Sequence, residues 1–123
     1  KQTERIIRAM DNPYFNILAH PTSRLINKRE ACEVDMEKVI LAAKERGCFL
    51  EVNAQPARMD LTDSHCRLAR EAGLKVAIST DAHSADNLDY MRFGLDQARR
   101  GWLEADDVLN TRKLDELRKL LKR

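Results

Sequence analysis

Residues with the chemistry of metal ligands follow apolar runs of strand length in this chain. His20 comes directly after the run "NILA", and Asp81 and His83, two residues apart, come at the end of the run "VAIST". Imidazole nitrogens and carboxylate oxygens together suit zinc, manganese or iron. Asn53 closes another run, "LEVN", and adds an amide at the same kind of position. These residues predict a metal site if the fold brings them together; otherwise His20 is a turn histidine and Asp81 a helix cap.

Apolar periodicity arranges these runs in an alternating order of strands and helices. Strands are predicted at residues 15–19, 48–54 and 74–80. Helices, several with one apolar face, are predicted at residues 3–12, 32–47, 61–73, 85–101, 104–110 and 111–123. Gly47 and Gly73 mark helix ends, and Thr111 is the expected N-cap of the last helix. Gly94 lies inside a predicted helix, at some cost in stability.

This alternation predicts an α/β fold with parallel strands and right-handed crossovers. The carboxyl ends of parallel strands meet at one edge of the sheet, where such folds build their sites. His20, Asn53, Asp81 and His83 are therefore expected close together in space. Three strands are too few to close a (βα) barrel, which takes roughly 250 residues. The chain is thus either a small open sheet or the C-terminal half of a barrel.

Composition limits the classes of function. The chain has 123 residues, of which 43% are hydrophobic and 34% charged, values typical of one soluble globular domain. A net charge of +2 is too small to indicate a nucleic-acid-binding protein by itself. The sequence has no apolar run long enough to span a bilayer. Its three cysteines lack C-x-x-C spacing, which favours reduced thiols in the cytoplasm over a disulfide framework.

Three longer stretches resemble one known family. They are "ILAHPTSRL", "LEVNAQPARMDLTDSHCRLAREAG" and "ISTDAHSADNLDYMRFGLDQARRGWLEADDVLNT", and they resemble the C-terminal part of the PHP (polymerase and histidinol phosphatase) domain of bacterial family X DNA polymerases. The resemblance implies that residues 1–123 are a single partial domain from a distorted seven-stranded (βα) barrel, a fragment whose remaining motifs lie upstream. It also implies metal-dependent phosphoester hydrolysis, with manganese-dependent 3′→5′ exonuclease activity on DNA ends in repair.

The resemblance also assigns metal ligands residue by residue. His20 matches the ligand of the family's "HP" motif, and Asp81 and His83 match its final "D-x-H" pair. The family's other ligands, among them an opening "H-x-H", lie upstream of Lys1. Metal-dependent hydrolysis of this kind uses two or more ions about 3.5–4 Å apart, which three ligands cannot hold. We therefore expect these residues alone to bind manganese, zinc or iron weakly and to hydrolyse little.

Other polar residues have structural and functional alternatives. Arg24 is expected to contact a phosphate or to form a salt bridge within its loop. Asn53 is expected to hold a ligand or a water, and Glu51, on the same strand face, to be a buried carboxylate with a partner. His65 is expected to be structural, at the end of the sheet away from the site. Trp102 is expected to anchor the short C-terminal helix.

Two other functions are compatible with the sequence: a small-molecule phosphoesterase similar to histidinol phosphatase, and a non-catalytic module that supports a polymerase. DNA is the expected partner, through the parent protein, and no membrane is involved. A half barrel exposes the edge of its first strand and its inner face. The chain is therefore expected either to form a homodimer or to fold its N-terminal helix over that face.

Overall fold

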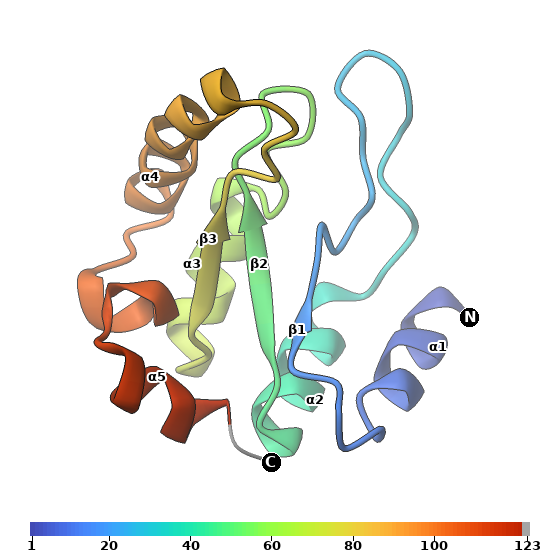
Figure 1. Ribbon diagram of the computed structural model, residues 1–123. Coiled ribbons are helices and arrows are strands. Elements are labelled where there is room, and N and C mark those ends of the chain that lie inside the picture. Colours follow the sequence, from blue (N-terminus) through green and yellow to red (C-terminus); the bar gives the residue numbers. More distant parts are fainter. Residues whose placement is uncertain (122–123) are drawn as a thin grey trace.

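A three-stranded parallel sheet forms the centre of the computed structural model, which describes residues 1–121 (Figure 1). In order across the sheet, the strands are β1 (Ile17–Leu18), β2 (Phe49–Asn53) and β3 (Val76–Ser79). The register pairs Leu18 with Leu50, and Asn53 with Ser79. The parallel order confirms the predicted α/β class. Within the described residues the sheet is open, which is consistent with part of a (βα) barrel.

Helices connect the strands and continue beyond the last of them. The α-helices are α1 (Gln2–Ala9), α2 (Met36–Arg46), α3 (Asp63–Ala72), α4 (Met91–Arg100) and α5 (Leu114–Leu120). Shorter 3-10 helices are η1 (Ala85–Tyr90), η2 (Ala105–Asp107) and η3 (Leu109–Thr111). In Figure 1, α2 and α3 lie behind the sheet, α4 lies beside β3, and α5 lies toward the lower end of the strands.

Capping residues bound α2 and α3. The side chains of Asp35 and Thr62 each accept a hydrogen bond, at 3.2 Å, from the backbone N–H three residues further along. Gly47 and Gly73 end the two helices with φ angles of 71° and 75°, a region that glycine enters without steric cost. Both glycines are thus confirmed as helix ends.

Several predicted boundaries are wrong. Strand β1 has two residues where five were predicted. After its C-terminal end, His20 takes a φ of 28° that is not extended. The helix predicted at residues 85–101 is divided into η1 and α4, and the one predicted at 104–110 is replaced by the short turns η2 and η3.

Thr111 is not the N-cap of the last helix. Its hydroxyl donates to the carbonyl oxygens of Ala105 and Val108, both at 2.8 Å, so it closes the turns that precede the helix. Helix α5 begins only at Leu114, with Lys113 at the N-cap position. The last two residues of the predicted helix, 122 and 123, lie outside the described residues.

The strands present alternating side chains to two faces of the sheet. Leu50, Val52, Val76 and Ile78 are at most 2% exposed and belong to the core that the strands share with the helices. The opposite face of β2 carries Phe49, Glu51 and Asn53, and the register places Ser79 beside Asn53 on that face. We call this second face the inner face. The prediction that Glu51 and Asn53 share a face is confirmed.

Helix α1 packs against α2. Figure 1 shows α1 beside α2, beyond β1, and the ion pair of Arg46 with Asp11 (2.7 Å) joins the ends of the two helices. The N-terminal helix therefore does not lie over the inner face, and that alternative is wrong. The homodimer stays a prediction.

The outer edge of β3 is covered by the segment 104–112, which we call the edge segment. Val76 forms a parallel bridge with Val108. Further along β3, Asn110 accepts a hydrogen bond from the N–H of Ile78 (3.0 Å) and donates one to its carbonyl (2.7 Å). One side chain thus supplies both hydrogen bonds that a neighbouring strand would supply at this position.

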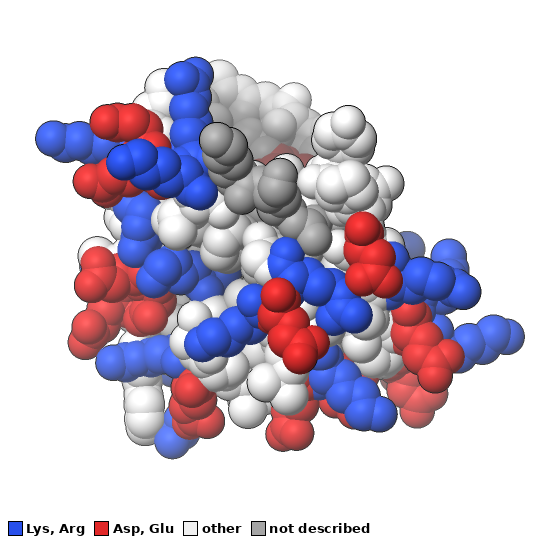
Figure 2. All heavy atoms as spheres, turned by 90° about the horizontal axis from the view of Figure 1, so that it is seen from below, with Lys and Arg blue, Asp and Glu red and all other residues white. Residues whose placement is uncertain are grey.

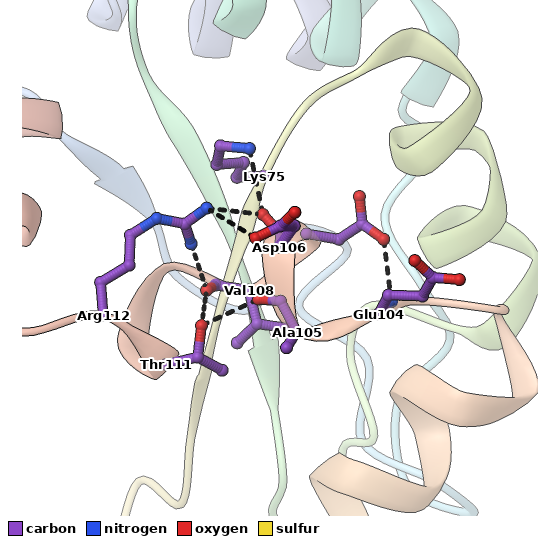
Figure 3. A network of polar contacts seen from close by, with 8 residues as sticks. Lys75, Glu104, Ala105, Asp106, Val108, Thr111 and Arg112 are labelled. Atoms are coloured by element: carbon purple, nitrogen blue, oxygen red, sulfur yellow. Dashed lines mark hydrogen bonds and ion pairs between the residues drawn. The ribbon is translucent and has the colours of Figure 1, made fainter.

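Cationic side chains hold the edge segment in shape (Figure 3). Lys75 donates to the carbonyl of Asp106 at 3.0 Å, and Arg112 donates to the carbonyls of Asp106 (2.8 Å) and Val108 (2.7 Å). At its start, the N–H of Glu104 donates to the carboxylate of Asp107 at 2.8 Å. The edge segment is therefore ordered by its own contacts as well as by β3.

Trp102 lies on the surface of the protein, against α3. Its side chain is 57% exposed, and the Arg67 guanidinium of α3 lies 3.8 Å from the centre of its ring. Its carbonyl accepts a hydrogen bond from Arg70, also on α3. Trp102 therefore attaches the chain to α3, but the short helix that it was expected to anchor is replaced by the turns η2 and η3.

The face opposite the carboxyl ends of the strands carries both signs of charge. Figure 2, seen from below Figure 1, shows Lys and Arg interleaved with Asp and Glu. This mixture agrees with the small net charge of +2 and does not favour nucleic-acid binding through that face. Among residues 1–121, no helix is long and apolar enough to cross a membrane.

Candidate functional site

Every residue of the predicted site lies at the carboxyl ends of the strands, which we call the carboxyl edge. His20 lies two residues beyond β1, Asn53 is the last residue of β2, and Asp81 and His83 follow β3. This edge is at the top of Figure 1, where the loops after the three strands emerge. The parallel topology is what brings together residues that are about sixty positions apart in the sequence.

Glu51 is the acceptor on which these strand ends converge. Its Oε2 accepts hydrogen bonds from the backbone N–H of His20 (2.7 Å) and from the side-chain amide of Asn53 (3.3 Å). Its Oε1 accepts one from the hydroxyl of Ser79, the last residue of β3. Glu51 is only 9% exposed, so the prediction of a buried carboxylate with partners is confirmed. Its partners come from all three strand ends.

Asn53 connects this carboxylate to Asp81. The Asn53 amide also donates to Oδ2 of Asp81 at 3.1 Å, while its Oδ1 accepts the N–H of Gln55 at 3.0 Å. Gln55 in turn donates to the carbonyls of Thr80 (3.0 Å) and Asp81 (2.6 Å). Asn53 is 1% exposed. It therefore holds one residue of the predicted ligand pair directly, and Gln55 fixes the backbone of the same residue.

The backbone is strained at two of the predicted ligands. His20 has a φ of 28° and Asp81 a φ of 52°, in the region that residues other than glycine rarely adopt. Such conformations cost about 1–3 kcal/mol each, persist only where the surroundings hold them, and concentrate at functional sites. Here the surroundings are the hydrogen bond that Glu51 accepts from the His20 N–H and, at Asp81, the bonds that Asn53 donates to its side chain and Gln55 to its carbonyl.

The two imidazoles differ in their surroundings. His83 is exposed, and its Nδ1–H donates to the carbonyl of Asp81 at 2.7 Å, which leaves Nε2 of a neutral ring with a free lone pair. This is the orientation that metal-binding histidines commonly adopt. Nδ1 of His20 is buried and has no hydrogen-bond partner among the described residues. Each ring therefore keeps a nitrogen that could bind a metal ion.

These donors do not add up to a complete metal site. Within residues 1–121, no group of three or more His, Cys, Asp or Glu side chains lies close enough together to hold a metal ion. The individual donors suit zinc or manganese, but as a set they do not fit a bound ion without further ligands.

Arg24 is used inside the protein. Its Nε and Nη2 donate to the carbonyls of Arg58 and Met59, each at 2.6 Å, and Arg58 donates back to the carbonyl of Arg24 (3.4 Å). The guanidinium thus joins the loop after β1 to the loop after β2. These bonds favour the structural alternative, although the partners are two carbonyls and not the carboxylate of a salt bridge.

Asp60 is a further buried carboxylate that the motif analysis missed. It is fully buried and accepts hydrogen bonds from the N–H (3.0 Å) and hydroxyl (2.9 Å) of Thr22. Its backbone also pairs with that of Asn53 in an antiparallel bridge. Asp60 therefore ties the turn that follows His20 to the end of β2. The signal in the sequence was a lone aspartate between apolar residues, which local pattern alone does not distinguish from a surface residue.

His65 lies nearer the carboxyl edge than predicted. Helix α3 runs back from the loop after β2, so its first turn, which holds His65, lies at the carboxyl edge. Partial burial lowers the pKa of His65, Asp60 opposes this shift, and Arg24 adds to it. Its Nδ1 is buried without a partner among the described residues. The predicted location was wrong because it ignored the direction of the helix after a parallel strand.

The sequence of this chain is similar to segments of known bacterial proteins. The chain is 42% identical over 120 residues to the DNA polymerase/3′-5′ exonuclease PolX of Bacillus subtilis (strain 168), a match that covers 98% of this chain. It is 33% identical over 117 residues, 90% of the chain, to a probable phosphatase of Thermoanaerobacter sp. (strain X514). A probable phosphatase of Caldanaerobacter subterraneus subsp. tengcongensis is 34% identical over 89 residues, 68% of the chain.

The matched region is a minor part of each of these proteins. The chain spans 21% of the polymerase, 45% of the Thermoanaerobacter phosphatase and 33% of the Caldanaerobacter phosphatase. No protein-family model matches the chain.

Proposed function

Since the chain is related over nearly its whole length to a segment of a bacterial family X DNA polymerase, we propose that it forms part of the phosphoesterase (PHP) domain of such a polymerase. In this proposal the chain is the C-terminal portion of a (βα) barrel, and the complete domain hydrolyses DNA phosphodiesters from the 3′ end. The observation that carries the proposal is the 42% identity over 98% of the chain. The shared carboxyl edge of His20, Asp81 and His83 supports it.

We propose these three side chains as ligands of divalent metal ions: manganese, zinc or iron, all of which bind imidazole and carboxylate donors. Further ligands must come from residues outside this chain, since the described residues hold no complete group. When bound, such ions polarise a phosphoryl oxygen and activate a water. The residues of this chain position the edge: Glu51 and Asn53 hold His20 and Asp81, and the Asp81 carbonyl orients the His83 ring.

A second candidate is a phosphatase acting on small phosphate monoesters. The relatives named as probable phosphatases favour it, because they match up to 90% of the chain. A third role, a non-catalytic module that supports a polymerase, is the outcome expected if DNA binds but is not cleaved. The three candidates predict cleavage of DNA, cleavage of a phosphate monoester, and DNA binding without cleavage, so one set of assays separates them.

The test uses the complete gene product that contains these residues. A 5′-labelled single-stranded oligonucleotide and p-nitrophenyl phosphate are each incubated with the protein and with manganese or zinc chloride. The expected result is stepwise release of nucleotides from the 3′ end, reduced at least about tenfold in His20→Ala and Asp81→Asn. Hydrolysis of the monoester alone would establish the second candidate instead.

Two controls make the assay specific. Asp115→Asn removes an exposed carboxylate from α5 and should leave the rate unchanged. The 123-residue chain by itself should show little hydrolysis. Wild-type rates in both His20→Ala and Asp81→Asn would refute the assignment of the site.

A further inference from the structure

The inner face of the sheet holds a carboxylate whose partners all belong to the carboxyl edge. Glu51 accepts hydrogen bonds from the backbone of His20, the amide of Asn53 and the hydroxyl of Ser79. These donors belong to the ends of β1, β2 and β3 respectively. A carboxylate can accept about four hydrogen bonds, so the three made here use most of its capacity and leave little for a metal ion.

Glu51 also reaches both strained residues of the site. It binds the N–H of His20 directly, and through Asn53 it is linked to the Asp81 carboxylate. Asn53 is 1% exposed, so water does not easily replace this amide as the connector. His20 and Asp81, the two predicted ligands with left-handed φ angles (28° and 52°), are thus both linked to the Glu51–Asn53 pair.

We propose that Glu51 is a positioning residue, whose carboxylate sets the backbone of His20 and, through Asn53, the side chain of Asp81 for the hydrolysis of a phosphoester. The inference rests on the proposed function for its role in the reaction. The contacts themselves do not depend on it. Misplacement of a reacting group by about 1 Å can cost roughly 100-fold in rate, so a holding contact at this edge has a large kinetic effect.

The hydrogen-bond pattern predicts which substitution is tolerated. In Glu51→Gln, the amide oxygen can take the place of Oε2 and accept from His20 and Asn53. The amide nitrogen then takes the place of Oε1 and donates to Ser79, whose hydroxyl can accept as well as donate. The negative charge is lost and the geometry is kept. Glu51→Ala removes both.

The first experiment measures kcat and KM of the complete gene product with the oligonucleotide. Glu51→Gln is expected within about threefold of wild type, whereas Glu51→Ala should lower kcat by about 10- to 100-fold with a smaller change in KM. Ser79→Ala should have a small effect by itself. Combined with Glu51→Gln, it should lower kcat by more than the two single effects together, because the new amide nitrogen loses its acceptor.

A matched control separates positioning from simple loss of stability. Asn110→Ala removes two hydrogen bonds from the middle of β3 without contacting any residue of the carboxyl edge. It should lower the midpoint of thermal unfolding and leave kcat of the folded protein unchanged. If Glu51→Ala behaves in the same way, Glu51 is merely structural and the inference is overturned.

The second experiment does not depend on catalysis. Hydrogen exchange followed by NMR should show that the His20 amide is protected in wild type and in Glu51→Gln, and unprotected in Glu51→Ala. If Glu51→Ala does not fold, the double variant Glu51→Gln/Ser79→Ala replaces it and should show weaker protection of this amide than wild type. If Glu51→Gln lowers the rate and the protection of the His20 amide as much as Glu51→Ala does, the charge of Glu51 is what matters, and the inference is overturned. If the wild-type protein shows the expected exchange pattern but does not hydrolyse the oligonucleotide, the proposed function is refuted and the hydrogen bond between Glu51 and the His20 amide is still established.

Discussion

Helix α4 lies close against the sheet at Gly94. A Cβ atom added there would lie 2.5 Å from Cγ2 of Ile78 and 2.9 Å from Cβ of Ala54. Optimal carbon–carbon contacts are about 3.5–4.0 Å, so the helix or the strands would have to move by about 1 Å. Neither neighbour can turn away, since Ile78 is 2% exposed on β3 and Ala54 has no rotatable side chain.

Two opposing effects set the magnitude of Gly94→Ala. Alanine in a helix interior is favoured over glycine by about 1 kcal/mol. Overpacking of a well-packed core costs about 1–3 kcal/mol. Because the close contacts are with rigid atoms, we expect the second effect to win and the protein to lose about 1–2 kcal/mol of unfolding free energy. This corresponds to a fall of about 4–8 °C in Tm.

Urea unfolding followed by circular dichroism measures this change. Ala54→Gly removes one of the two close contacts. Gly94→Ala should therefore lower the unfolding free energy less in the Ala54→Gly protein than in wild type. Because Ala54 follows Asn53 and Ile78 precedes Ser79, the shift should also lower the rate of phosphoester hydrolysis. A gain of about 1 kcal/mol, the value expected from helix propensity alone, would refute the close approach.

Three further predictions concern titration, thiol reactivity and loop structure. Burial lowers the pKa of His65 in the folded protein, so the unfolded chain binds the proton more readily; stability should be full above about pH 6.5 and fall as the pH drops below it, and His65→Gln should flatten this slope in urea titrations. Burial raises the pKa of Cys66 to about 12, so at pH 8 only the exposed Cys32 should react quickly with DTNB, a reaction that Cys32→Ser abolishes. Arg24→Lys should cost about 1–2 kcal/mol of stability with KM unchanged, since lysine lacks the rigid fork of N–H donors that fits both carbonyls. A raised KM at unchanged stability would favour a phosphate contact instead.

The meeting of the proposed site residues at one edge of the sheet could be predicted from the sequence, because it depends on topology alone. Once strands and helices alternate, residues such as His20 and Asp81 that follow strands must meet at one edge. The same rule, applied to α3, would have located His65 correctly. The error lay in treating a helix start as distant from the strand end that leads into it.

The contacts at the edge could not be predicted in the same way. The bond from Ser79 to Glu51 depends on the register between β2 and β3, which pairs Asn53 with Ser79. The role of Asp60 depends on a loop that turns back onto β2. Neither register nor loop path has a local signal here, because both are set by packing between distant segments.

The edge segment leaves the β1 side of the sheet as the side at which a further strand could pair. Val108 and Asn110 already occupy the outer side of β3, so a strand from any other source would have to displace them. Beside β1, no strand of residues 1–121 is paired. An additional strand, from the same polypeptide or from a second copy, could therefore pair with β1 without displacing a strand of the described residues.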